Sequence, residues 1–330
     1  MKRLVFLLVL VGLRLEAAAP RSVEEWISFL PGSKVWDQQL RTGVLPLLDP
    51  EGLTASAWLP DPLRFSDGRD ITRPDMWKER RAELLLLFEH YVTGRMPPPP
   101  DRLRVAEFRD SRANGINHRT LTLVFNDQEE ARLRVELFVP DGPGPFPVFL
   151  TQANHRAWAL VAASRGYLGC VYAGADTQDD TPRFAQLWPN SDATLLTRRA
   201  WAGSRSVDYL LTLPEVNREQ IAVVGHSRNG KQSLIAAAFD ERIAGVVAVA
   251  GFTPMRTDTA DRGTGGVARW SHWLPLLPRL GAFVGYEDKI PYDYHDLLSL
   301  IAPRRIVLVQ PTTDYHATLA DVRTCVDRVR

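Results

Sequence analysis

Residues 221–234 read IAVVGHSRNGKQSL, in which an apolar run leads into a glycine-containing turn. The run predicts a buried strand, and the residues from Gly230 onward predict a helix. A serine on such a sharp turn exposes its hydroxyl oxygen, and the helix N-terminus favours negative charge beside it. Ser227 is therefore predicted to be a nucleophile, although the G-x-S-x-x-G spacing is one residue longer than usual. The alternative is a turn whose serine only caps the helix.

Further apolar runs alternate with helical stretches on both sides of this segment. Strands are predicted at 119–125, 133–140, 146–152, 167–174, 246–252 and 304–310. Helices are predicted at 156–165, 195–212, 230–239, 292–301 and 319–330. Alternating strands and helices indicate an α/β protein with a mostly parallel sheet and crossover connections.

The composition of the chain excludes some classes of function and gives no support to others. The chain has 330 residues and a formal net charge of +1, so its charge gives no case for nucleic-acid binding. Its 2 cysteines exclude a disulfide scaffold. The sequence contains no CxxC, HExxH, P-loop or dinucleotide-binding motif, so neither a metal nor an organic cofactor is predicted.

The chain is predicted to have three parts. In residues 1–19, Lys2 and Arg3 precede a short apolar run and three alanines, a pattern typical of a secretory signal peptide. The alternative is a buried first helix. Residues 20–100 are predicted to be an extension with one helix, at 76–93, and residues 101–330 a catalytic domain. A secreted or periplasmic protein is expected, with no membrane segment in its mature form.

The turn also carries a resemblance to a known family. GHSRNGK (225–231) matches the signature G-[CH]-S-R-x-G-K of the glucuronoyl esterases, carbohydrate esterase family 15. Other stretches resemble bacterial members and relatives labelled acetyl xylan esterases. These are LFEHYVTGRMP (87–97), LTQANHRAW (150–158), GCVYAGADTQDDT (169–181), RRAWAGSRSVDYL (198–210) and PYDYHDLLSLIAPRR (291–305). The resemblance covers about residues 76–330.

This resemblance implies an α/β-hydrolase fold, with helices on both faces of the sheet, and a serine ester hydrolase acting on plant cell-wall esters. Ser227 would be the nucleophile, and Arg228 would stabilise the oxyanion with its backbone N–H and its guanidinium group. Lys231 would contact sugar hydroxyls, and Tyr315 stands where many members have a tryptophan in the substrate pocket. The alternative for Arg228 and Lys231 is a solvated helix start.

Three further groups of residues are candidates for binding. The loop after strand 146–152 usually supplies a second oxyanion donor, so a backbone N–H near Gln152 is expected there. Trp273, like Trp270, can stack on a sugar or pack as part of a lid. Asp176, Asp179 and Asp180 can bind a cation, but an acidic solvated loop is the favoured interpretation.

The acid and the base of a catalytic triad are harder to assign. Asp314 follows the strand at 304–310, where an α/β hydrolase places its acid. Asp258 and Asp261 are weaker substitutes, because many family members carry a Glu after the preceding strand. Of the 7 histidines, His316 is the candidate base because its loop should reach the catalytic edge.

The base usually lies beyond one more strand. The helix at 319–330 is the last element predicted, so a C-terminal strand and its histidine loop are expected to be missing, which leaves the edge of strand 304–310 exposed. The two explanations are a truncated esterase and a divergent member with another base.

The predicted function is a secreted serine carboxylic-ester hydrolase, with glucuronoxylan or acetylated xylan as its carbohydrate ester substrate. The alternatives are an acetyl xylan esterase and an inactive carbohydrate-binding relative. No nucleic-acid or membrane partner is expected, and no oligomeric state is predicted.

Overall fold

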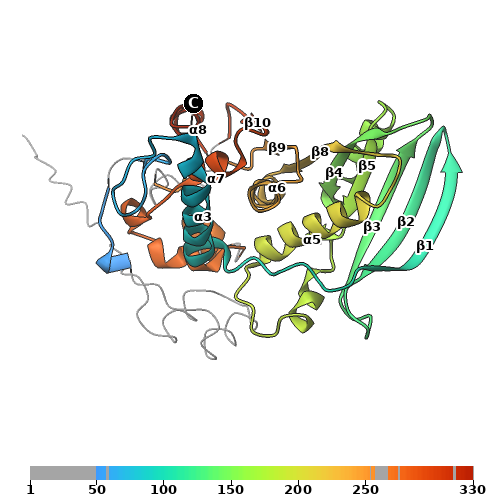
Figure 1. Cartoon of the computed structure of the whole chain (residues 1–330), viewed down its shortest axis with the longest axis horizontal. Helices are drawn as coiled ribbons and strands as arrows, with labels where there is room; N and C mark the ends of the chain where they lie inside the picture. The colour runs from blue at the N-terminus through green and yellow to red at the C-terminus, as the bar shows by residue number, and fades with distance from the viewer. Residues whose placement is uncertain are drawn as a thin grey trace, which may run out of the picture.

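An eight-stranded sheet runs through the molecule (Figure 1). The computed structural model describes residues 50–56, 59–252, 254–256, 267–273, 276–314 and 317–329. The strands of the sheet are β1 (Arg104–Ala113), β2 (Ile116–Val124), β3 (Arg132–Pro140), β4 (Phe146–Gln152), β5 (Leu168–Tyr172), β8 (Val216–His226), β9 (Gly245–Val249) and β10 (Arg305–Val309). Their order across the sheet is β1-β2-β3-β5-β4-β8-β9-β10.

The sheet has a parallel part and an antiparallel part. Strands β5, β4, β8, β9 and β10 pair in parallel with their neighbours, whereas β1, β2 and β3 join through antiparallel pairs that end at β5. The predicted strands with continuous apolar runs lie in the parallel part, and those with alternating patterns lie in β2 and β3. β10 ends the sheet among the described strands, and its Val307 and Val309 are 49% and 46% exposed.

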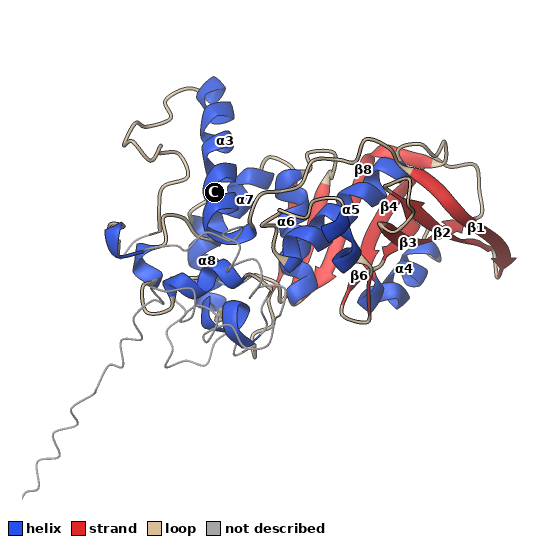
Figure 2. Ribbon diagram, turned by 90° about the horizontal axis from the view of Figure 1, so that it is seen from below, coloured by secondary structure: helices blue, strands red, loops and turns tan. Residues whose placement is uncertain are grey.

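Helices cover both faces of the sheet, as predicted (Figure 2). They are α3 (Trp77–Phe88), α4 (Arg156–Ala163), α5 (Leu195–Leu210), α6 (Arg228–Phe239), α7 (Tyr294–Ile301) and α8 (Leu319–Asp327). Successive residues of a strand point to opposite faces. In β3, Leu137 belongs to the main core, which includes α5 and α6, whereas Phe138 packs with Ala159 and Ala163 of α4.

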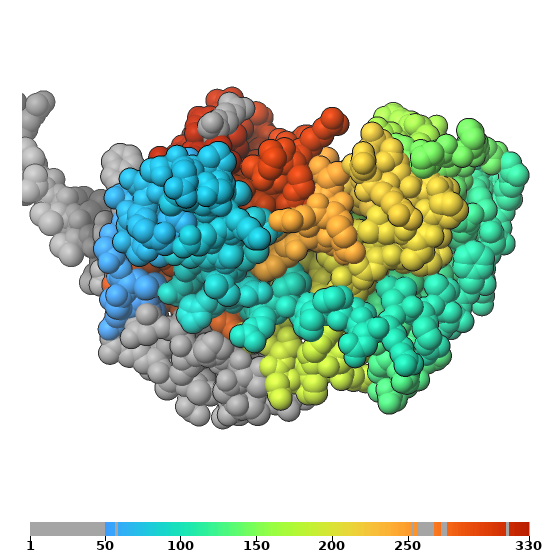
Figure 3. Space-filling model, viewed as in Figure 1, coloured from blue at the N-terminus to red at the C-terminus, as the bar shows by residue number. Residues whose placement is uncertain are grey.

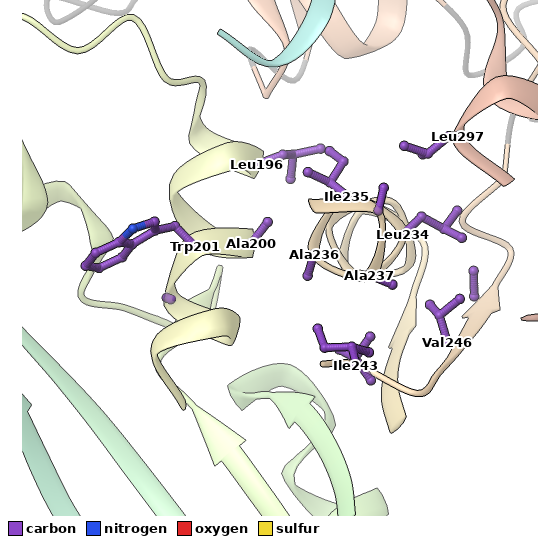
Figure 4. Packing of buried hydrophobic residues seen from close by; sticks show 14 of the residues in the cluster. Leu196, Ala200, Trp201, Leu234, Ile235, Ala236, Ala237, Ile243, Val246 and Leu297 are labelled. Atoms are coloured by element: carbon purple, nitrogen blue, oxygen red, sulfur yellow. The ribbon is translucent and has the colours of Figure 1, made fainter. Parts of the chain in front are cut away.

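Helix α6 lies at the centre of the main core (Figure 4). Every residue from Asn229 to Ala238 is buried, so the helix has no solvent face. Leu196 and Ala200 of α5 approach it from one side, and Leu297 of α7 approaches it from another. This packing fixes the position of the residue just before α6, which is Ser227.

The N-terminal extension packs onto the same core. Helix α3 and the following π-helical turn η3 (Glu89–Thr93) lie within the predicted helix at 76–93 and bury Leu84 and Phe88. The space-filling view shows this segment against the C-terminal part of the chain (Figure 3). His295 of α7 donates a hydrogen bond through Nε2 to the Pro60 carbonyl oxygen at 2.8 Å.

Helix α7 begins with a buried acidic cap. The backbone N–H of Asp293 donates to Oδ2 of Asp296 at 3.1 Å, and both carboxylates form a capping box. Asp296 is fully buried, and burial raises the pKa of its carboxyl group to about 6. The ionised form is therefore less favourable in the folded protein than in the unfolded chain.

Asp296→Asn should change how stability depends on pH. The folded pKa lies above the ordinary value of 3.8, so the folded state binds the proton more tightly. The stability of the wild type relative to the variant should therefore fall as the pH rises from about 4 to about 6, by up to about 3 kcal/mol. Urea unfolding at pH 4, 5, 6 and 7 measures this difference. A difference that stays constant would contradict the assignment, and the exposed Asp70→Asn serves as control.

Candidate active site

Ser227 occupies the turn between β8 and α6 in a strained backbone conformation. Its φ of 55° and ψ of −124° are rare for a residue with a side chain. Such a conformation costs on the order of 1–3 kcal/mol and persists only where the surrounding structure imposes it. The Ser227 side chain makes no capping hydrogen bond to α6. The alternative of a serine that only caps the helix is therefore wrong.

Three glycines allow the turn to be this tight. A Cβ at Gly225 would lie 2.3 Å from the carbonyl oxygen of Asn229. A Cβ at Gly230 would lie 2.9 Å from the Cα of Gly251, and one at Gly251 would lie 2.6 Å from the Cα of Gly230. The first turn of α6 thus meets both β8 and the backbone after β9 at distances that admit no side chain. The longer G-x-S-x-x-G spacing places its second glycine at this contact.

Arg228 is the first residue of α6 and is held by an acidic loop. Its Nη1 lies 2.7 Å from Oδ2 of Asp176, whose Oδ1 accepts a hydrogen bond from Arg199 at 2.9 Å. Arg199 is buried and also pairs with Asp179, in the short hairpin of β6 (Gly174–Ala175) and β7 (Gln178–Asp179), at 2.8 Å. Asp180 pairs with Arg134.

The carboxylates of the acidic loop therefore form ion pairs with arginines of this chain. The prediction of a solvated acidic loop is wrong for Asp180, which is buried, and for Asp179, which is half-buried, whereas Asp176 is exposed as predicted. Within the described ranges, no group of three metal-ligating side chains is placed to hold a metal ion. The consequence for Arg228 is a guanidinium group that is paired with a carboxylate next to the serine turn.

Lys231 is fully buried one turn into α6. Its Nζ lies 4.5 Å from the ring centroid of Trp270, in the π-helical turn η7 (Arg269–Trp273), and 4.5 Å from that of Tyr294 in α7. Two aromatic faces thus replace part of the water that an ammonium group loses on burial. The alternative of a solvated helix start is wrong for Lys231, and a sugar would reach it only after the surrounding side chains move.

Gln152, at the end of β4, lies beneath the turn. Its Nε2 donates to the hydroxyl of Tyr172 at 3.2 Å and to Oγ of Ser233 at 2.9 Å. Gln232 donates to the same tyrosine hydroxyl at 2.9 Å, and burial raises the pKa of Tyr172 to about 12. The Gln152 side chain is thus used inside the fold, and only a backbone N–H of its loop stays a predicted contact for substrate.

His155 follows in the same loop and borders the residues around Ser227. Its Nε2 accepts a hydrogen bond from the backbone N–H of His226 at 3.2 Å and lies 3.2 Å from Nδ2 of Asn229. Its ring stacks on Trp158 with a centroid distance of 4.3 Å. Burial, together with the charge on His226, lowers the pKa of His155 to about 4. Sequence reasoning assigned no role to this histidine, and its place directly after β4 was the available signal.

The structure describes the predicted acid but not the predicted base. Asp314 lies in the loop after β10, and its Oδ2 accepts a hydrogen bond from Nε2 of Gln310 at 3.2 Å. Because β8 and β10 are parallel to β9, this loop and Ser227 lie at the same edge of the sheet. His316 and Tyr315 lie outside the described residues, as do the substitute acids Asp258 and Asp261. Trp273 ends η7, but its side chain is not among those described.

A family profile described as "Glucuronyl esterase, fungi" matches residues 123–328. The chain belongs to the glucuronoyl esterase family. A 4-O-methyl-glucuronoyl methylesterase of Schizophyllum commune is 27% identical over 288 residues, or 78% of this chain. Another from Phanerochaete chrysosporium is 28% identical over 291 residues, or 79% of this chain. The match spans 68% of the first relative's length and 58% of the second's.

Solved structures of family members share the fold. A glucuronoyl esterase from Solibacter usitatus has a TM-score of 0.70 at 21% identity, covering 84% of this chain and 85% of its own. A mutant glucuronoyl esterase from Sporotrichum thermophile, in complex with methyl 4-O-methyl-β-D-glucopyranuronate, has a TM-score of 0.66 at 21% identity, covering 86% and 79%. The predicted α/β-hydrolase fold is confirmed.

Gly225→Ala should disrupt the serine turn of this glucuronoyl esterase family member. The new Cβ would meet a backbone oxygen at 2.3 Å, which no side-chain rotation relieves. We expect a loss of about 2 kcal/mol or more in the free energy of unfolding, measured by thermal or urea unfolding. Gly52→Ala is the matched control, because no atom lies within 4 Å of its Cβ position. Equal stability of the two variants would show that the close contact at the turn does not exist.

Proposed function

We propose that this chain is a serine carboxylic-ester hydrolase that cleaves esters of 4-O-methyl-glucuronic acid in hemicellulose. The observation that carries this proposal is Ser227, held at positive φ at the N-terminus of a buried helix in a glucuronoyl esterase family chain. Relatives named 4-O-methyl-glucuronoyl methylesterases support this substrate class. So does the related structure in complex with a methyl glucuronate.

In the proposed reaction, Oγ of Ser227 attacks the ester carbonyl carbon and forms a tetrahedral oxyanion. The backbone N–H of Arg228 and a backbone N–H of the loop after β4 would donate hydrogen bonds to this oxyanion. The Arg228 guanidinium, held by Asp176 at 2.7 Å, would add positive charge without having to reorganise. The alcohol then leaves with the proton that the base removed from Ser227. Water next releases the uronic acid from the acyl-enzyme, and the serine hydroxyl regains a proton.

The proton from Ser227 needs an acceptor. We assign this role to His316, with Asp314 orienting its ring, because both follow β10. Asp314 lies at the sheet edge of Ser227, which supports its part in this pair.

Sugar recognition is proposed for Lys231, with Tyr315 and Trp273 as stacking or hydrogen-bonding partners of the uronate ring. Lys231 would donate charge-assisted hydrogen bonds to sugar hydroxyls once substrate displaces the surrounding side chains.

Export is proposed for the protein on the strength of residues 1–19, which lie outside the described residues and read as a signal peptide. None of the helices in the described part of the chain is both long and apolar enough to span a bilayer. The division into a signal peptide, an extension (20–100) and a catalytic domain (101–330) belongs to the same proposal.

Ser227→Ala should abolish covalent labelling by a fluorophosphonate, in which Oγ of the serine displaces fluoride from phosphorus. Hydrolysis of a methyl glucuronate ester should fall at least about a thousandfold in this variant. The exposed Ser111→Ala is the matched control and should keep both activities. Gel fluorescence and chromatographic detection of the released acid measure the two effects.

Each other outcome of this experiment has a distinct meaning. Labelled protein that cleaves acetylated xylan and leaves the glucuronate ester intact would replace the proposal with an acetyl xylan esterase. Folded wild-type protein that takes no label would identify an inactive relative.

Lys231→Met should separate sugar recognition from ester chemistry. The methionine keeps a long side chain between Trp270 and Tyr294 but removes the ammonium group. We expect kcat/KM to fall at least about tenfold for a methyl glucuronate ester and to stay within about threefold for 4-nitrophenyl acetate. Lys78→Met, at an exposed position of α3, should leave both rates unchanged. An equal loss on the two substrates would reject the sugar contact.

A further inference from the structure

We infer that His155 is a positioning residue for the nucleophile, a role that rests on the proposed esterase activity. Its ring bridges the two ends of the serine turn. The His226 N–H, on one side of Ser227, donates to Nε2 at 3.2 Å, and Nδ2 of Asn229, on the other side, lies 3.2 Å from the same nitrogen. A single acceptor atom therefore fixes the residue before Ser227 and the residue two after it.

The backbone donor determines the tautomer of His155. A backbone N–H can only donate, so Nε2 has to carry a lone pair, and the ring proton lies on Nδ1. Asn229 then presents its amide NH2 group, rather than its oxygen, to Nε2. Asn229 is itself buried in the first turn of α6, so this bond ties the loop after β4 directly to that helix.

The surroundings of His155 keep the ring neutral. Its ring centroid lies 6.2 Å from that of His226, the titratable group that faces it from β8. Arg156, the next residue, pairs with Glu136 of β3 at 2.9 Å, and Arg228 of α6 pairs with Asp176. Burial and His226 together lower the pKa of His155 to about 4, so Nε2 accepts hydrogen bonds throughout the neutral range.

The same geometry argues against a general-base role for His155. The single lone pair of its Nε2 is shared by two donors that belong to the turn, and a pKa near 4 makes the ring a weak proton acceptor at neutral pH. Loss of the ring should therefore slow the chemical step by misplacing Ser227, whereas loss of the base removes most of the activation of the serine.

Two substitutions at His155 isolate the acceptor. His155→Phe keeps a ring that can stack on Trp158 but has no acceptor, whereas His155→Gln offers a carbonyl oxygen near the position of Nε2. We expect kcat on a methyl glucuronate ester to fall about 10- to 100-fold in the phenylalanine variant, with KM within about twofold. The glutamine variant should recover kcat to within about threefold of the wild type.

His90→Phe is the control, because the exposed His90 also contacts an aromatic ring, that of Tyr91 with a centroid distance of 4.5 Å, but lies in η3 and not beside β8. It should leave kcat unchanged. If His155→Phe folds and has the kcat of the wild type, or if it raises KM alone, the positioning role is wrong. Failure of the glutamine variant to recover kcat would also overturn it.

Nuclear magnetic resonance of protein labelled with ¹⁵N-histidine tests the hydrogen bond without turnover. The His155 ring should show a protonated Nδ1 and a bare Nε2 at pH 7, and the His226 amide signal should shift in His155→Phe. A protonated Nε2, or a His226 amide unaffected by the substitution, overturns the inference. This spectrum needs no substrate, so it tests the hydrogen bond even in a protein that has no esterase activity. Absence of esterase activity would contradict the proposed function, whereas the spectrum decides on the hydrogen bond.

Discussion

The contact between Gly230 and Gly251 is the constraint on which the active-site geometry depends. At this point the first turn of α6 meets the backbone after β9 with no room for a Cβ on either side. Core residues such as Leu234 and Leu196 hold the rest of α6 in place. The chain between β8 and this contact is therefore too short and too crowded for a relaxed backbone, and Ser227 takes a positive φ. Packing free energy of the core thus maintains strain at the reactive residue.

Several polar groups around the turn form hydrogen bonds or ion pairs within the fold. Asp176 holds the Arg228 guanidinium, and Gln152 and Tyr172 form a buried network under α6. His155 adds a bridge across the turn. A site built from such bonds does not need to reorganise when charge develops, which is the condition under which hydrogen-bond donors lower a barrier most.

The sequence predicted the fold where the apolar pattern was strong. The apolar run at 146–152 has the same bounds as β4. It was predictable because its buried residues alternate little and turn residues mark its ends. The missed strand of the eight-stranded sheet is β1, all ten residues of which are exposed, so no apolar alternation marks it. Asn114 and Gly115, both at positive φ, form the turn to β2, and this dipeptide was the signal for a hairpin.

The candidate site was predictable only where it is local in sequence. Ser227 and Arg228 follow from one turn, whereas the burial of Lys231 depends on Trp270 and Tyr294, which lie on segments far along the chain. His155 depends on the strand order. Parallel pairing of β4 with β8 places the loops that leave both strands at one edge, side by side. If β4 and β8 were not neighbours, the sequence around Ser227 would be unchanged but His155 would not reach His226 and Asn229. The strand order of the sheet, and not the spacing of residues in the sequence, therefore brings His155 to the nucleophile.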